Sequence, residues 1–107
     1  MSPIDLELHD AVLRTLAIDF DGRSLTLVVD AYLAPDQKAR KPVELIFSDV
    51  TDLSCLADFA NLSANAKAGN INYWVPSLEG KSSYLYLTDG CLAINAGQVV
   101  VRELSQM

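Results

Sequence analysis

The side chains best suited to proton transfer in this chain of 107 residues are its only histidine, His9, and the neighbouring Asp10. Histidine titrates near neutral pH, and a carboxylate beside it could support general acid–base catalysis. Neighbours in an extended segment point to opposite faces, however, so the two side chains cannot pair there without a turn. The sequence identifies no nucleophile or third member. We therefore expect no catalytic residues and no enzymatic activity, and we expect His9 to tie the N-terminal segment to the edge of a sheet.

Other patterns that carry chemistry are absent from the sequence. The carboxylates lack the Asp-x-Asp-x-Asp-Gly spacing of a calcium loop, and no glycine-rich phosphate loop occurs. The two cysteines, Cys55 and Cys91, have no zinc-site spacing, and two unpaired thiols are typical of a reducing compartment. We expect no metal site and no cofactor.

An aromatic cluster is the most informative candidate site. If Tyr73 faces inward opposite Leu85, then Trp74 lies opposite Tyr84 on the outer face, with Tyr86 beside them. Tryptophan and tyrosine combine apolar area with a hydrogen-bonding tip and dominate protein interfaces, and they also stack on sugars. The same side chains would be ordinary core if a helix covered this face. These three alternatives stay open in the sequence.

The charge is acidic, at −6, and acidic residues outnumber basic ones most clearly in residues 1–37. Such a surface repels nucleic acid and acidic membranes, so we expect neither as a partner, whereas it suits a basic protein. Asp30 and Asp36 are our candidate contacts for that partner. The opening residues lack the features of a signal peptide, and no apolar stretch reaches the length of a membrane helix. We expect a cytoplasmic protein.

Two Asp-Gly pairs predict hairpins, because this pair suits a two-residue type I′ turn. Around Asp21-Gly22, the expected register places Ile18 opposite Leu25 and Leu16 opposite Leu27. Around Asp89-Gly90, it places Leu87 opposite Leu92 and Leu85 opposite Ile94. Arg14 then falls on the apolar face, so the first strand must bend before it or lie at the sheet margin.

The remaining segments read as strands around one helix. Residues 43–47 alternate as a third strand, and residues 70–75 as a fourth. Between Asp52 and Lys67 the apolar spacing becomes helical, with Thr51 or Asp52 as the N-cap and Gly69 after the end. The sequence therefore predicts a mainly β, α+β domain over residues 1–107. Its architecture is an antiparallel meander of about six strands, curled into a small sandwich or half-barrel, with one helix between strands three and four.

Three short stretches resemble a loose group of small bacterial domains: Leu8-His9-Asp10, Phe47 to Val50 and Gly69-Asn70-Ile71. Several members of that group are similar to immunity proteins of polymorphic-toxin and contact-dependent inhibition systems. The resemblance implies a cytosolic, non-enzymatic protein that binds and blocks a cognate toxin, and it carries over no catalytic residue. A carbohydrate-like ligand-binding module and a structural or homo-oligomeric domain are the alternatives. The sequence does not fix the oligomeric state.

Overall fold

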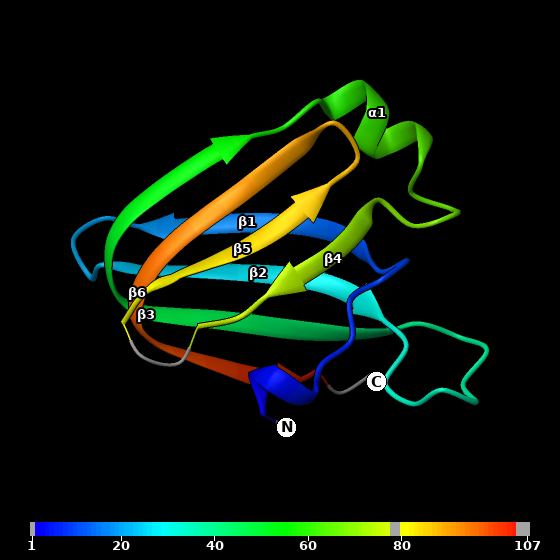
Figure 1. Cartoon of the computed structure of the whole chain (residues 1–107), viewed down its shortest axis with the longest axis horizontal. Coiled ribbons are helices and arrows are strands. Elements are labelled where there is room, and N and C mark those ends of the chain that lie inside the picture. Colours follow the sequence, from blue (N-terminus) through cyan, green and yellow to red (C-terminus); the bar gives the residue numbers. More distant parts are fainter. Residues whose placement is uncertain (1, 78–79, 105–107) are drawn as a thin grey trace.

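The computed structural model describes residues 2–77 and 80–104, which form six strands and two short helices (Figure 1). The elements in chain order are η1 (Pro3–Asp5), β1 (Val12–Asp19), β2 (Ser24–Ala31), β3 (Lys41–Leu56), α1 (Phe59–Ala64), β4 (Ile71–Val75), β5 (Ser82–Leu87) and β6 (Gly90–Glu103). Within these described residues, no helix has the length and apolar character needed to cross a membrane.

All six strands belong to one antiparallel sheet in the order β1-β2-β3-β6-β5-β4. The predicted fold class is confirmed: a mainly β domain with its one α-helix between the third and fourth strands. Strands β3 and β6 are much longer than the rest, and they curve through both halves of the sheet (Figure 1). The first half of β3 pairs with β2 and β6, whereas its second half pairs only with β6 among the described strands.

The bend in β3 has identifiable causes. Asp49 adopts a left-handed backbone with φ of 53°. The register against β6 then shifts between Val50 and Asp52, which marks Thr51 as the extra residue of a β-bulge. On the partner strand, a Cβ on Gly97 would lie 3.1 Å from the Cβ of Asp49, so glycine allows the two strands to approach closely. The bend folds the sheet over its own apolar face.

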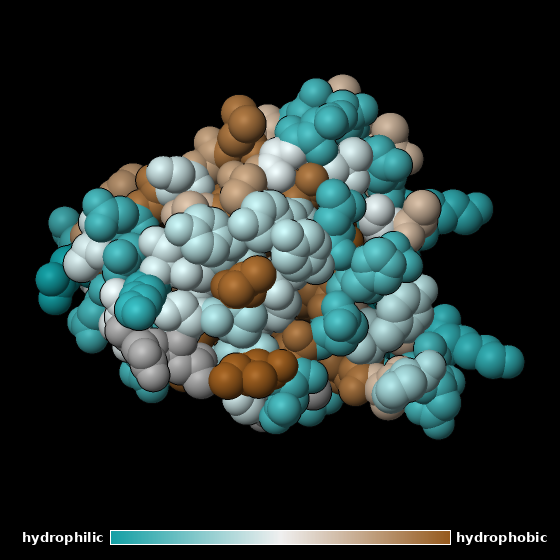
Figure 2. All heavy atoms as spheres, in the orientation of Figure 1, coloured by the Kyte–Doolittle hydropathy of each residue, from teal (hydrophilic) through white to brown (hydrophobic). Residues whose placement is uncertain are grey.

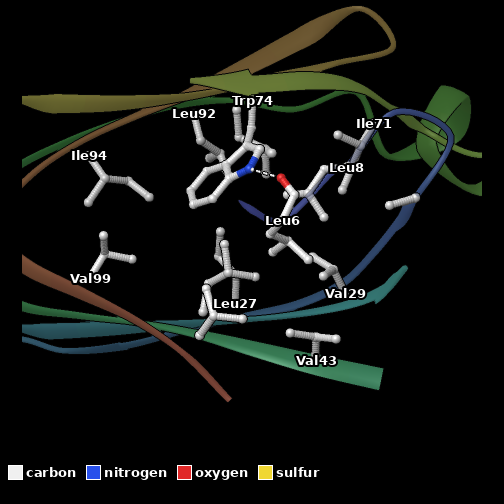
Figure 3. Packing of buried hydrophobic residues seen from close by; sticks show 14 of the residues in the cluster. Leu6, Leu8, Leu27, Val29, Val43, Ile71, Trp74, Leu92, Ile94 and Val99 are labelled. Atoms are coloured by element: carbon white, nitrogen blue, oxygen red, sulfur yellow. Dashed lines mark hydrogen bonds between the residues drawn. The ribbon is translucent and has the colours of Figure 1, made fainter. Parts of the chain in front are cut away.

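The core lies between the two halves of the folded sheet, as the alternation predicts. Val43, Leu45 and Phe47 of β3 are buried at every second position, matching the expected inward side chains. The segment before β1 contributes Leu6 and Leu8 to the same cluster (Figure 3). This N-terminal segment, and not the helix, closes one side of the core.

The first hairpin confirms the predicted register, with Ile18 opposite Leu25 and Leu16 opposite Leu27. The predicted type I′ turn is wrong, because the left-handed residue is Arg23 (φ 52°) and neither Asp21 nor Gly22 has positive φ. A carboxylate oxygen of Asp19 accepts a 3.0 Å hydrogen bond from the Gly22 amide and holds this alternative turn.

The start of β1 resolves the position of Arg14. A register shift between Leu13 and Thr15 leaves Leu13 opposite Val29 and bulges Arg14 out of the ladder. The strand therefore bends at the arginine, and the basic side chain avoids the apolar face.

The predicted helix from Asp52 to Lys67 is wrong in its first half. β3 continues to Leu56, with Leu53 opposite Ile94, and α1 begins only at Phe59. Asp58 is the N-cap, and its carboxylate accepts a hydrogen bond from the Asn61 amide. Pairing with the long β6 strand overrides the local helical spacing. None of the α1 residues is buried, and Leu62 is only partly buried against the core cluster.

The second hairpin differs from the predicted pairing by two positions. Leu85 lies opposite Leu92 and Leu87 opposite Gly90, with the left-handed residue at Asp89 (φ 55°). Because side chains in a strand alternate with a period of two, this slip keeps every residue of β5 on its predicted face.

Candidate functional site

A β-bulge in β4 decides which aromatic side chains reach the surface. Ile71 pairs with Leu87, but Tyr73 pairs with Tyr86, so Asn72 is an extra residue on β4. One inserted residue turns every later side chain of the strand to the opposite face. Tyr73 therefore points outward and Trp74 inward, the reverse of our prediction.

Trp74 is a core residue, so its predicted position on the outer face is wrong. Its side chain lies among Leu6, Leu92 and Ile94 (Figure 3), and only 9% of the residue is exposed. The indole Nε1–H donates a 3.0 Å hydrogen bond to the carbonyl oxygen of Leu6. The ring thus fills the core and fastens the N-terminal segment to β4.

Three tyrosines occupy the outer face instead, and we call Tyr73, Tyr84 and Tyr86 the tyrosine face. The ring centroids of Tyr73 and Tyr86 are 4.6 Å apart, those of Tyr84 and Tyr86 are 6.1 Å apart, and both pairs are stacked. Tyr73 is 51% exposed and Tyr84 is 38% exposed. Figure 2 views the molecule from the side on which β4 and β5 lie nearest the reader, where weakly hydrophilic residues gather around a few hydrophobic ones.

The stacking determines what this face can bind. Tyr86 has a ring neighbour in both Tyr73 and Tyr84, so the surfaces left to a ligand are mostly ring edges, hydroxyl groups and the outer faces of the end rings. Partial burial, followed by the proximity of Tyr73, Cys91 and Tyr84, raises the pKa of Tyr86 above its ordinary value. A tyrosine hydroxyl is protonated at neutral pH even with its ordinary pKa, so the Tyr86 hydroxyl is a hydrogen-bond donor there.

Tyr73 is the site residue that the sequence reasoning missed. A signal for it exists, since Ile71 and Trp74 are three residues apart and would face opposite sides of a regular strand. Burying both apolar side chains requires one irregular residue between them, and the bulge at Asn72 supplies it.

His9 holds this bulge from the N-terminal segment. Its Nδ1 lies 2.8 Å from the carbonyl oxygen of Asn72, while the Asn72 side-chain amide donates to the Leu87 carbonyl at 3.3 Å. The expected link between His9 and a sheet edge is therefore present, because β4 is an edge strand. The chain makes the turn that pairing of His9 and Asp10 requires: Asp10 has φ of 65°, and Nε2 of His9 lies 3.5 Å from the Asp10 carboxylate.

The contacts of His9 predict a pH-dependent contribution to stability. The Asn72 carbonyl, followed by the Asp10 carboxylate, raises the pKa of His9 above its ordinary value of about 6.5. A raised folded-state pKa stabilises the fold most below the unfolded-state value, and the contribution disappears as pH rises through the folded-state value. We expect His9→Ala to lower the urea midpoint more at pH 5 than at pH 8.5. An equal loss at both pH values would contradict this role. His9→Gln, which keeps a polar side chain but cannot titrate, should also lose more stability relative to the wild type at pH 5 than at pH 8.5.

The two predicted acidic contacts lie apart from the tyrosine face. Asp30 is on β2, and its Oδ2 accepts a 2.6 Å hydrogen bond from Arg14 Nε, which compensates its charge. Asp36 is exposed in the loop between β2 and β3. Strands β3 and β6 separate β2 from β5 in the sheet, so the structure does not bring these carboxylates together with Tyr84 and Tyr86.

The two thiols lie on neighbouring strands of the sheet, Cys55 on β3 and Cys91 on β6. Cys55 lies opposite the inward-facing Leu92, whereas Cys91 lies opposite Tyr86, so the two thiols occupy opposite faces of the sheet. Within residues 2–77 and 80–104, no three His, Cys, Asp or Glu side chains gather as a metal site would require. Comparison of the chain with protein-family models, with curated proteins and with solved structures finds no match.

Proposed function

We propose that this chain is a non-enzymatic domain that binds a protein partner through the tyrosine face. The observation that carries the proposal is the stack of three tyrosines on the edge strand β4 and its neighbour β5. Exposed tyrosines supply large contact area at a small entropic cost, and they are enriched among residues that dominate binding energy. Val75, at 46% exposure on the same strand, extends the apolar part of this surface.

A basic partner fits the charge of the domain. The net charge of −6 favours rapid association with a positively charged surface, and salt should slow that association. The resemblance to immunity proteins adds a partner class, a toxin domain that the chain would occlude. Together, these features support stoichiometric inhibition of a basic toxin in the cytoplasm as the biological role.

Affinity capture from the cells that make the protein tests this function. We expect the wild-type chain to retain one basic protein at equal stoichiometry. The double variant Tyr73→Ser/Tyr84→Ser should weaken binding by more than about 2 kcal/mol, or roughly 30-fold, if these residues are hot spots. Val100→Ser is the matched control, because Val100 is also exposed (41%) but lies on β6 beyond its bend.

The inhibitory role needs a separate measurement. Expression of the captured protein alone should slow the growth of a host cell, and coexpression of the chain should restore growth. If the captured protein binds but is harmless, the toxin assignment fails and the binding function stands. If the tyrosine variants bind as well as the wild type, the tyrosine face is not the interface.

A carbohydrate-like ligand is the second candidate, favoured by the exposed outer rings of Tyr73 and Tyr84. Tyrosine fluorescence, and not that of the buried Trp74, is the appropriate signal for a titration with mono- and oligosaccharides. A saturable change that disappears in Tyr73→Ser/Tyr84→Ser would replace the protein-partner proposal. The protein proposal predicts no change across the sugar panel.

A further inference from the structure

A groove separates β1 from the second half of β3, and we call it the β1 groove. Two hollows of about 530 Å³ and 290 Å³ lie end to end along β1. The larger hollow is bounded by residues 12–16 of β1, by Cys55 of β3 and by Phe59 and Leu62 of α1. The smaller one continues past Ile18 and Phe20 and is bounded on the other side by residues 50–53 of β3.

The β1 groove is apolar, and large side chains stand exposed at its margins. Phe20 is 82% exposed and Phe59 is 83% exposed, while Ile18 on the strand itself is 41% exposed. Leu16 and Leu53 are only partly covered by the core cluster. Burial of such side chains by a ligand would be favourable, at about 25 cal/mol per Å² of apolar surface.

Both strands beside the groove offer unpaired backbone. Among the described strands, β1 pairs only with β2, and residues 52–56 of β3 pair only with β6. The bulge at Arg14 disrupts the start of the β1 edge, but residues 15–19 form a regular stretch without proline or lysine. An open edge of this kind is a template for an additional strand.

The charge at one end of the groove selects the chemistry of that strand. Asp19, Asp21, Asp49 and Asp52 surround the hairpin end, where Arg23 is the basic counterpart and lies 3.7 Å from Asp49. The net charge around this end of the groove is negative, as is the net charge of the whole chain. A second copy of this acidic chain would meet electrostatic repulsion, whereas a segment with lysine or arginine side chains would be attracted.

From this combination, we propose that the β1 groove binds an extended segment of a basic protein, which adds as a strand to β1. Because neighbouring side chains in a strand face opposite sides, the segment should alternate apolar residues, directed into the groove, with basic residues on the solvent side. This site is separate from the tyrosine face and does not depend on the function proposed for it.

The two native thiols allow each surface to be measured separately. Cys55 lines the β1 groove, and Cys91 pairs with Tyr86 beside the tyrosine face. The variant Cys91→Ser retains only Cys55, and Cys55→Ser retains only Cys91. In each variant, the rate at which a disulfide reagent modifies the remaining thiol shows whether a ligand covers the surface beside it. The probe is a blocked nine-residue peptide of alternating valine and lysine.

We expect this peptide to slow labelling of Cys55 and to leave labelling of Cys91 unchanged. At a concentration ten times its Kd, about one groove in eleven stays free, so Cys55 should react about tenfold more slowly. A peptide with glutamate in place of lysine should not protect Cys55, and neither should one with N-methylated alternate amides, which cannot pair with β1. Equal protection by the glutamate or the N-methylated peptide, or no protection by any peptide, overturns the proposal.

Variants of the groove complete the test. Ile18→Ser should weaken protection of Cys55, whereas Val100→Ser, at the same exposure of 41% on another strand, should not. Neutralising the groove end with Asp21→Asn/Asp52→Asn should weaken peptide binding more than the remote pair Asp5→Asn/Asp36→Asn does.

A dimer of the chain would give a different result. If Cys55 becomes protected as the chain alone is concentrated, and light scattering shows a dimer, the occupant is a second copy and the proposal is wrong. None of these outcomes bears on the tyrosine face, because a ligand bound there is detected by the labelling rate of Cys91.

Discussion

Replacement of Trp74 by alanine should lower the free energy of unfolding by about 3–5 kcal/mol, the usual cost of removing a large buried aromatic side chain. The indole is almost fully buried and its Nε1–H is bonded to the Leu6 carbonyl, so the variant loses both core volume and the anchor of the N-terminal segment. A domain of this size has a total stability of about 5–15 kcal/mol, so the loss approaches global unfolding. Urea denaturation followed by far-ultraviolet circular dichroism measures it.

Two comparisons separate the parts of this effect. Trp74→Phe keeps most of the apolar volume but leaves the Leu6 carbonyl without its donor, so we expect a loss of about 1–3 kcal/mol. Tyr73→Ala, next to it on the exposed face, should change stability by less than about 1 kcal/mol. If the loss in Trp74→Ala were as small as that in Tyr73→Ala, the inward orientation of the indole would be wrong.

Replacement of Asn70 by leucine should cost about 1–3 kcal/mol, because it leaves two partly buried backbone groups unpaired. Asn70 is 2% exposed. Its Oδ1 accepts a 2.7 Å hydrogen bond from the Leu13 amide, and its Nδ2 donates a 3.0 Å hydrogen bond to the Leu62 carbonyl. One amide therefore joins β1 to the residue before β4 and to α1.

Leucine has the same number of side-chain heavy atoms as asparagine and branches at the same carbon, so Asn70→Leu removes both hydrogen bonds while it keeps the outline of the side chain. Asn70→Asp provides the control. A carboxylate keeps the acceptor for Leu13 but cannot donate to Leu62 and buries a charge, so this variant should recover stability as pH falls and the carboxyl group is protonated. A leucine variant as stable as the wild type would show that water satisfies both backbone groups.

The fold was predicted from the sequence more accurately than the local geometry was. The spacing of apolar residues is a strong signal for strands, whereas bulges and turn types leave only a weak signal. The first hairpin kept its predicted register even though its turn is of another type, since the facing leucines of β1 and β2 determine the pairing. The helix boundary failed at residues 52–56. There, pairing with β6, which lies some 40 residues further along the chain, outweighs local propensity.

The candidate site shows the same limit at single-residue scale. Tyr84 and Tyr86 lie on their predicted face, because the second hairpin differs from the predicted register by two positions and an even shift preserves the face of each side chain. Trp74 does not, because the bulge at Asn72 shifts β4 by one. Asn72 is held by His9, so the orientation of the aromatic residues depends on a contact between segments 63 residues apart. Spacing along the chain does not encode such a contact.

The length of β3 and β6 has a consequence for how quickly the chain reaches its native state. These strands join Val43 to Glu103 and Leu56 to Cys91, with α1, β4 and β5 in the intervening loop. Pairs so distant must close a long loop before their contacts repay the lost entropy, which gives high contact order and refolding on a scale of about milliseconds to seconds. Since both strands run through each half of the sheet, neither half has a separate scaffold, and we expect refolding to be a single slow cooperative event.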